Sequence, residues 1–166
     1  MNNVPCKKIT RKRVFCTLFS FVLLASCSNT LRQWKIDSNK TSHPKFRSSR
    51  LYLKTEDNFS GLEVDLINTS QGQVVYINTF GLELKPEGYT LEKYAIINIT
   101  IRINEQSLQS QGYLLEGGQR IFLSPEASQI LIEALNQNKS VELIIAGLST
   151  TIIPDQFSEH YQTWKQ

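Results

Sequence analysis

The chain has 166 residues, of which 40% are hydrophobic and 20% charged, a composition that is typical of one globular domain and excludes wholesale disorder. Its net charge of +3 comes from one end, because residues 1–13 carry five of the eighteen Lys and Arg. Beyond residue 26, 13 basic and 15 acidic side chains leave a net charge of about −2. This balance excludes a basic nucleic-acid-binding surface, so no nucleic acid partner is expected.

The first 26 residues have the three parts of a secretory signal peptide. A basic segment, 1–13, is followed by an apolar segment, 14–25, and then by a small residue, Ser26. The apolar segment is too short for a typical membrane span, which needs about 20 residues. A short anchor or a buried helix is the alternative, but a core helix would not be apolar all round beside five positive charges. We therefore predict that 1–26 is removed by cleavage between Ser26 and Cys27.

The four residues Leu24-Ala25-Ser26-Cys27 resemble the lipobox of bacterial lipoproteins. The resemblance implies a diacylglycerol on the sulfur of Cys27, cleavage just before it and acylation of the new amino group. Several acyl chains give stable membrane anchoring, at roughly 0.8 kcal/mol per buried methylene. Ser28 in the next position implies the outer membrane, facing the periplasm, in an organism with two membranes. Cys6 and Cys16 lie in the removed peptide, so a disulfide within the mature chain is not expected.

Residues 27–45 are predicted to be a lipid-anchored, flexible polar tether, and 46–166 a β-rich globular domain. Asn, Ser, Thr and Lys dominate the tether, and Pro44 disfavours a helix before it. Trp34 and Ile36 are exceptions to its polar character. They are interpreted as contacts with the lipid interface or as loose docking on the domain, with a partner-binding segment as the alternative.

Alternating apolar and polar residues, or runs of β-branched and aromatic residues, predict most of the domain to be strands. The strongest is 91–104, in which four isoleucines from Ile97 to Ile103 share one face. Gly117-Gly118 indicates a hairpin turn, and Pro86 and Gly88 restrict 81–90 to a short or edge strand. The predicted strands are 50–56, 59–68, 73–80, 91–104, 113–116, 120–123, 141–145 and 150–153.

Two helices are predicted. Ser124 is a favourable N-cap before Pro125, and apolar residues from 127 to 135 recur with helical spacing. Asp155 is expected to cap a terminal helix, whose aromatic residues Phe157, Tyr161 and Trp164 point one way. They are interpreted as core residues, with a binding site as the alternative. The expected fold is mainly β, an antiparallel β-sandwich or open barrel with one internal amphipathic helix and a short C-terminal helix.

Residues suited to catalysis or metal binding are scarce. Histidines occur only at His43 and His160, and the lipidated cysteine is the one thiol after cleavage, so a zinc or Cys–His site is not expected. Glu63 and Asp65 share the polar face of a strand and are candidates for a carboxylate pair. The interpretation favoured by the alternation is that both acids lie on a solvated face. No catalytic residue, metal or cofactor is therefore predicted.

A second polar stripe lies opposite the isoleucines of 91–104. It consists of Asn98, Thr100 and Arg102, and it is interpreted as solvent-exposed strand surface rather than a ligand site.

The C-terminal third of the chain resembles the end of the invasion-associated locus B family of secreted proteins. The resemblance lies in an amphipathic helix, a polar turn, a β-hairpin and an aromatic-led terminal helix, with Phe157 at the position of the family's phenylalanine. The family's glycine before it is Gln156 here, and its paired cysteines are missing. The resemblance covers about a quarter of the chain and implies a β-rich fold.

These features lead to a functional expectation. We expect a membrane-anchored, non-enzymatic envelope lipoprotein whose domain binds a protein, cell-wall or lipid partner or supports an envelope assembly. The alternative is a small periplasmic enzyme, with Glu63 and Asp65 converging in a pocket, or an enzyme inhibitor that presents residues 81–90 as a rigid loop. A secreted virulence factor is a third possibility, implied by the family resemblance alone.

Overall fold

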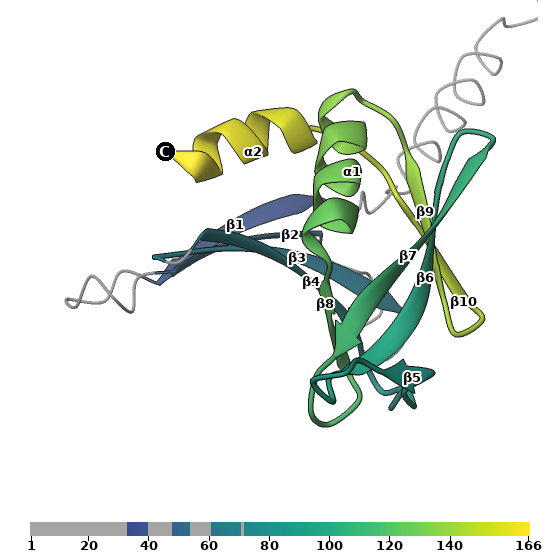
Figure 1. Cartoon of the computed structure of the whole chain (residues 1–166). Coiled ribbons are helices and arrows are strands. Elements are labelled where there is room, and N and C mark those ends of the chain that lie inside the picture. Colours follow the sequence, from purple (N-terminus) through teal and green to yellow (C-terminus); the bar gives the residue numbers. More distant parts are fainter. Residues whose placement is uncertain (1–32, 40–47, 54–60, 71) are drawn as a thin grey trace, which may run out of the picture. The chain divides into compact units, whose positions relative to one another are not determined.

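The computed structural model describes residues 33–39, 48–53, 61–70 and 72–166. The predicted signal peptide, Cys27 and His43 lie outside these ranges. The described residues form a ten-stranded antiparallel sheet and two helices, which confirms the mainly β prediction (Figure 1). The elements are β1 (Trp34–Asn39), β2 (Ser48–Leu53), β3 (Leu62–Thr69), β4 (Gly72–Thr79), β5 (Gly88–Tyr89), β6 (Ala95–Ile103), β7 (Gln106–Leu114), β8 (Arg120–Leu123), α1 (Pro125–Asn136), β9 (Val141–Ile145), β10 (Leu148–Ile152) and α2 (Phe157–Lys165).

The strands form one open sheet in the order β1-β2-β3-β4-β8-β7-β6-β9-β10, with β5 added at β6. The sheet bends strongly, so that the β1–β4 part and the β6–β10 part face each other across α1 (Figure 1). The indole Nε1 of Trp34 on β1 donates a hydrogen bond of 3.3 Å to the carbonyl of Ile153, just after β10. The two ends of the sheet path are therefore joined by a side chain and not by a backbone ladder.

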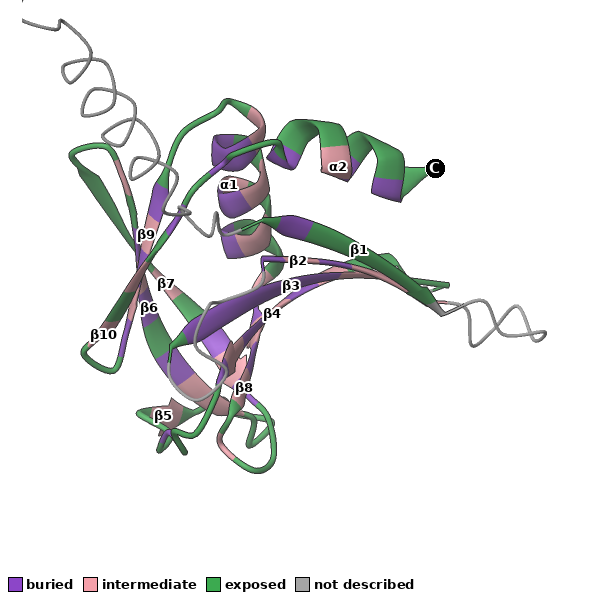
Figure 2. Cartoon of the chain, turned by 180° about the vertical axis from the view of Figure 1, so that it is seen from behind, coloured by how far each residue is buried: buried purple, intermediate pink, exposed green. Residues whose placement is uncertain are grey.

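Helix α1 begins where the sequence predicts. The Ser124 side chain accepts a hydrogen bond from the Ala127 amide, and Pro125 occupies the first turn, where its missing N–H costs nothing. The buried face of the helix carries Ala127, Leu131, Ala134 and Leu135. This stripe packs on the concave side of the sheet, against the buried Ile97, Ile99 and Ile101 of β6 and their neighbours (Figure 2).

The prediction of a tether over 27–45 is wrong for Trp34–Asn39, which form the edge strand β1. This segment pairs along its whole length with β2, from Trp34 opposite Leu53 to Asn39 opposite Ser48. Trp34 is only 2% exposed and packs edge-on against Phe157, with ring centroids 4.7 Å apart. Residues 35–38 of the strand are exposed, so the segment is mostly polar and has a composition like that of a linker. Trp34 is therefore a core residue.

The start of α2 also differs from the prediction, since Asp155 is not its cap. The N-cap is Gln156, which adopts a left-handed backbone conformation and makes no capping hydrogen bond through its side chain. Burial of aromatic rings holds the helix instead. Phe157, Tyr161 and Trp164 are all buried, as predicted, and Phe157 stacks on Tyr161 with ring centroids 5.3 Å apart.

Strand β7 is longer than predicted, and its turn with β8 holds the β4–β5 loop. Strand β7 begins at Gln106, seven residues before the predicted segment, because its first half is polar and exposed. Gly118, in the β7–β8 turn, has a positive φ of 67°, and a Cβ there would lie 2.7 Å from the carbonyl oxygen of Leu84. The same residue accepts a 2.7 Å hydrogen bond from the Leu84 amide, which fixes the β4–β5 loop on the turn. The β9–β10 hairpin predicted across Gly147 is confirmed.

Removing the Trp34 ring tests whether β1 belongs to the folded domain. We expect Trp34→Ala to lower the free energy of unfolding by about 3 kcal/mol, because a buried ring and its edge contact with Phe157 are lost. Urea denaturation of the purified chain, followed by circular dichroism, measures the change.

Ile36→Ala, on the same strand, is the control for Trp34→Ala. Ile36 is 40% exposed, so its truncation should cost less than about 1 kcal/mol. Equal losses in the two variants would contradict a core role for Trp34.

Candidate functional site

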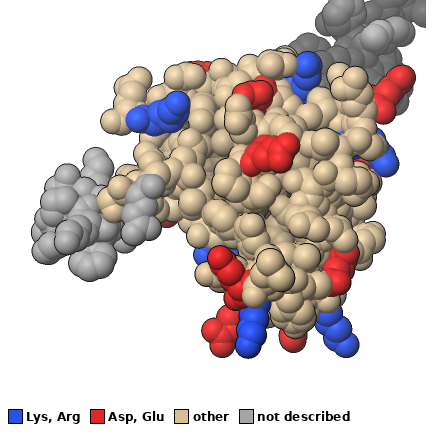
Figure 3. All heavy atoms as spheres, viewed as in Figure 1, with Lys and Arg blue, Asp and Glu red and all other residues tan. Residues whose placement is uncertain are grey.

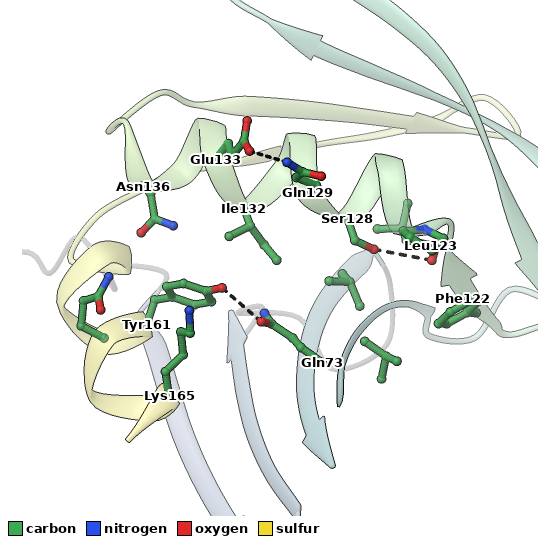
Figure 4. Close-up of a pocket in the computed structure, with 14 residues that line it drawn as sticks. Gln73, Phe122, Leu123, Ser128, Gln129, Ile132, Glu133, Asn136, Tyr161 and Lys165 are labelled. Carbon is green, nitrogen blue, oxygen red and sulfur yellow. Dashed lines mark hydrogen bonds between the residues drawn. The ribbon is translucent and has the colours of Figure 1, made fainter. Parts of the chain in front are cut away.

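A groove of about 530 Å³ lies between α1, α2 and the strands β4 and β8 (Figure 4). Its volume lies within the range of small-ligand sites. Its floor is apolar and includes Val75 and Leu123, and Figure 4 shows Ile132 pointing from α1 into the space above Tyr161 and Gln73. Polar side chains stand around this floor; they are Gln73, Ser128, Gln129, Glu133, Asn136, Tyr161, Gln162 and Lys165.

Hydrogen bonds hold part of this polar lining in place. The Tyr161 hydroxyl donates to Oε1 of Gln73 at 3.1 Å and so links α2 to β4. Nε2 of Gln129 donates to Oε1 of Glu133 at 2.7 Å along α1. Within the described residues, Oδ1 of Asn136 is buried and accepts no hydrogen bond. Carboxamides both donate and accept, so this lining suits an uncharged polar group such as a peptide or acetamido unit.

The groove was not foreseen from the sequence. Its residues come from β4, β8, α1 and α2, which are separated by up to 92 positions between Gln73 and Lys165. The only sequence signal was the polar side of α1, which is also the ordinary pattern of any surface helix.

Glu63 and Asp65 lie side by side on the convex face of the sheet, and the prediction that they are solvated is wrong. Glu63 is 7% exposed and Asp65 only 2%. Arg50 of β2 covers both acids, and its Nη2 lies 2.5 Å from Oε1 of Glu63 and 2.6 Å from Oδ1 of Asp65. The alternation of β3 correctly indicated which face each residue occupies. It did not show that long side chains from neighbouring strands cover the polar face.

Asp65 makes contacts with three other strands. Besides Arg50 on β2, its Oδ2 accepts a hydrogen bond of 2.7 Å from Nδ2 of Asn78 on β4. The guanidinium of Arg120 on β8 lies 3.6 Å from the same oxygen. Each arginine also lies over a tyrosine ring at 4.1 Å, Arg50 over Tyr52 and Arg120 over Tyr76. These cation–π contacts fix the guanidinium groups above the acids.

Glu63 and Asp65 share the guanidinium group of Arg50. Burial raises the pKa of Glu63, and the negative charge of Asp65 raises it further, while Arg50 lowers it by a smaller amount. Burial would lower the pKa of Arg50, but its hydrogen bond to Asp65 and the two acidic charges raise the pKa overall. Asp65 is therefore the main counter-ion of Arg50, and Glu63 is an acid whose pKa is raised above its ordinary value.

The acid cluster is separate from the groove. The guanidinium groups occupy the space in front of the carboxylates, and neither acid lines the groove described above. The stripe of Asn98, Thr100 and Arg102 is surface-facing as predicted and forms cross-strand hydrogen bonds, such as the 3.0 Å bond from Thr100 to Gln109.

A second hollow, of about 670 Å³, lies on the convex face next to the acid cluster. The register places Asp65, Tyr76, Phe122 and Tyr113 in one row across β3, β4, β8 and β7. The rings of this row and that of Tyr94 follow one another at centroid distances of 5.7, 5.9 and 6.2 Å. The hollow is lined by Tyr76, Thr90, Leu91, Glu92, Tyr94, Tyr113, Leu115 and Phe122.

Within the part of the chain that the structure describes, no three His, Cys, Asp or Glu side chains are placed to hold a metal ion together. Neither α1 nor α2 is long and apolar enough to cross a membrane.

Comparison with known proteins gives no match: no family model, no curated protein and no solved structure is significantly similar to the chain. The resemblances to bacterial lipoproteins and to the invasion-associated locus B family therefore stay predictions.

Substitutions of the two acids by their amides should have different effects on the free energy of unfolding. Asp65→Asn leaves Arg50 without its main partner, and we expect a loss of about 2 kcal/mol in the free energy of unfolding at pH 7, since both arginines are partly exposed. Glu63→Gln should leave stability at pH 7 unchanged or higher. Thermal unfolding of each variant at several pH values measures both effects.

The pH dependence has a definite sign. Because the pKa of Glu63 is raised in the folded state, its stabilising contribution is complete below its ordinary value of 4.5 and is lost as the pH rises through the higher folded value. Any advantage of Glu63→Gln should therefore disappear at low pH. A Glu63→Gln variant less stable than the parent at pH 7 but not at pH 4 would contradict this account.

Proposed function

We propose that this protein is a membrane-anchored envelope lipoprotein, non-enzymatic, whose β-rich domain binds a protein or cell-wall partner through the groove between α1 and α2. The anchor is supported by the signal-peptide pattern of 1–26 and the lipobox ending at Cys27. The observation that carries the binding function is a groove with an apolar floor and a carboxamide-rich lining. Hydrogen-bonding groups over an apolar floor give both orientation and affinity to a bound chain.

The anchor would hold the domain close to the membrane. Only six residues separate Cys27 from Trp34, the first residue of β1. Seven peptide steps span at most about 25 Å even when fully extended. The partner would therefore be a molecule found near the membrane surface.

The arrangement of charged groups also favours binding over catalysis. Glu63 and Asp65 are engaged by Arg50, Asn78 and Arg120 rather than directed at a substrate space. The groove's own charged lining is Glu133, hydrogen-bonded to Gln129, and Lys165, whose Nζ lies 5.2 Å from the ring centroid of Tyr161.

The anchor is tested by metabolic labelling with a radioactive fatty acid. Cys27→Ala should abolish the label and leave unprocessed precursor, because the thiol that receives the diacylglycerol is gone. Cys16→Ala, within the predicted signal peptide, is the matched control and should keep both label and processing. Labelling that persists in Cys27→Ala would rule out this lipidation site.

The groove is tested by site-specific crosslinking in intact envelopes. A photoreactive residue in place of Gln129, which lines the groove, should give a discrete crosslinked product that mass spectrometry can identify. The same residue in place of the exposed Ser149 on β10 should not. No product from position 129, or the same product from both positions, would contradict binding in the groove.

A further inference from the structure

The hollow on the convex face has an unusual amount of exposed apolar surface around it. Leu91 is fully exposed at the tip of the β5–β6 turn, Tyr94 is 57% exposed, and Leu115 is 38% exposed at the β7–β8 turn. The turn that presents the first two is well ordered by hydrogen bonds, from the Thr90 amide to the Tyr94 carbonyl and from the Tyr94 amide to the Thr90 hydroxyl. Contiguous apolar surface exposed to solvent often marks an interaction site.

The residues that line the hollow favour a cationic ligand. Four aromatic rings line it, and the face of an aromatic ring carries negative electrostatic potential. Among the residues that line the hollow, only Glu92 has a formally charged side chain. Arg120 lies over Tyr76 and is paired with Asp65, and Lys93 in the β5–β6 turn does not line the hollow. Aromatic faces together with one carboxylate are the groups that bind organic cations in proteins.

The same face of this protein already binds guanidinium groups in this way. Arg50 lies 4.1 Å above the ring of Tyr52, and Arg120 lies 4.1 Å above the ring of Tyr76. Tyr113 and Tyr94 continue this aromatic surface without an arginine above them in the described structure. Planar guanidinium groups stack on aromatic rings more readily than compact ammonium groups do.

We propose that the hollow binds an arginine side chain presented by a partner polypeptide. The guanidinium would stack on Tyr113 or Tyr94 beside Glu92, and the apolar stem would lie along Leu91 and Leu115. Figure 3 shows basic and acidic side chains mixed at the end of the molecule that carries β5, without a broad patch of one charge on the face in view. Specificity for an arginine side chain then depends on the residues that line the hollow. The proposal does not require the lipid anchor or the groove between the helices.

A pair of peptides tests this proposal on the full chain in a nonionic detergent. The probe is the capped tripeptide acetyl-Gly-Arg-Gly amide, and its control carries citrulline, which has nearly the shape of arginine but no charge. We expect the arginine peptide to bind at least about fivefold more tightly and to shift the NMR signals of the Tyr94 and Tyr113 rings. Equal binding of both peptides, or shifts confined to other residues, would overturn the proposal.

Variants separate charge from shape. Glu92→Gln should weaken binding of the arginine peptide severalfold, and Tyr94→Leu should do the same although it keeps an apolar wall. Lys93→Gln, in the same turn but outside the lining of the hollow, should leave binding unchanged or slightly stronger. Because all three side chains are exposed, thermal unfolding should be unaffected and will show that each variant is folded.

Choline distinguishes a partner side chain from a lipid headgroup. Choline presents a quaternary ammonium without a guanidinium plane or a peptide. Weaker binding of choline than of the arginine peptide supports the proposal. Binding of choline but not of the peptide would overturn it and assign the hollow to small ammonium groups.

Discussion

The carboxylate of Asp65 lies where four strands meet, and its need for partners constrains the whole sheet. It is almost completely removed from water on β3, and its oxygens contact Arg50 of β2, Asn78 of β4 and Arg120 of β8. A buried carboxylate without such partners would cost several kcal/mol. The strand order β2-β3-β4-β8 therefore gives the Asp65 carboxylate its polar partners and also pairs the backbone hydrogen-bonding groups of these strands. The ladder between β4 and β8 has only three residue pairs, so this side-chain bridge strengthens the sheet where its backbone pairing is short.

The same interaction organises the convex face. Because Arg50 and Arg120 bind the acids, their guanidinium planes lie over Tyr52 and Tyr76, and the row of rings continues from Tyr76 to the hollow beside Leu91. A sheet face that alternation alone would leave in water becomes a packed polar layer bordered by exposed aromatic surface. The acids hold this layer together through their contacts with Arg50, Asn78 and Arg120.

The two candidate surfaces have different positions and different chemistry. The groove is lined in part by α2, which contacts β1, whereas the aromatic hollow is lined in part by the β5–β6 turn. Figure 1 shows α2 and β5 at opposite ends of the domain. One is lined by carboxamides and suits uncharged polar groups, and the other combines rings with one carboxylate. A membrane-anchored domain with this arrangement would present one surface beside its point of entry and another away from it.

The sequence by itself determined the strands with clear alternation, the cap of α1 at Ser124 and the buried aromatic face of α2, because these depend on neighbours within one element. The sequence pattern also predicts a signal peptide and a lipobox at Cys27, both from local residues alone. Tertiary structure decided that the polar segment from Trp34 is a strand, since its one buried ring packs on Phe157, 123 positions away. It also decided that Glu63 and Asp65 are buried. Their cover comes from Arg50 and Arg120 on other strands, and no local pattern can show which side chains a bent sheet brings together.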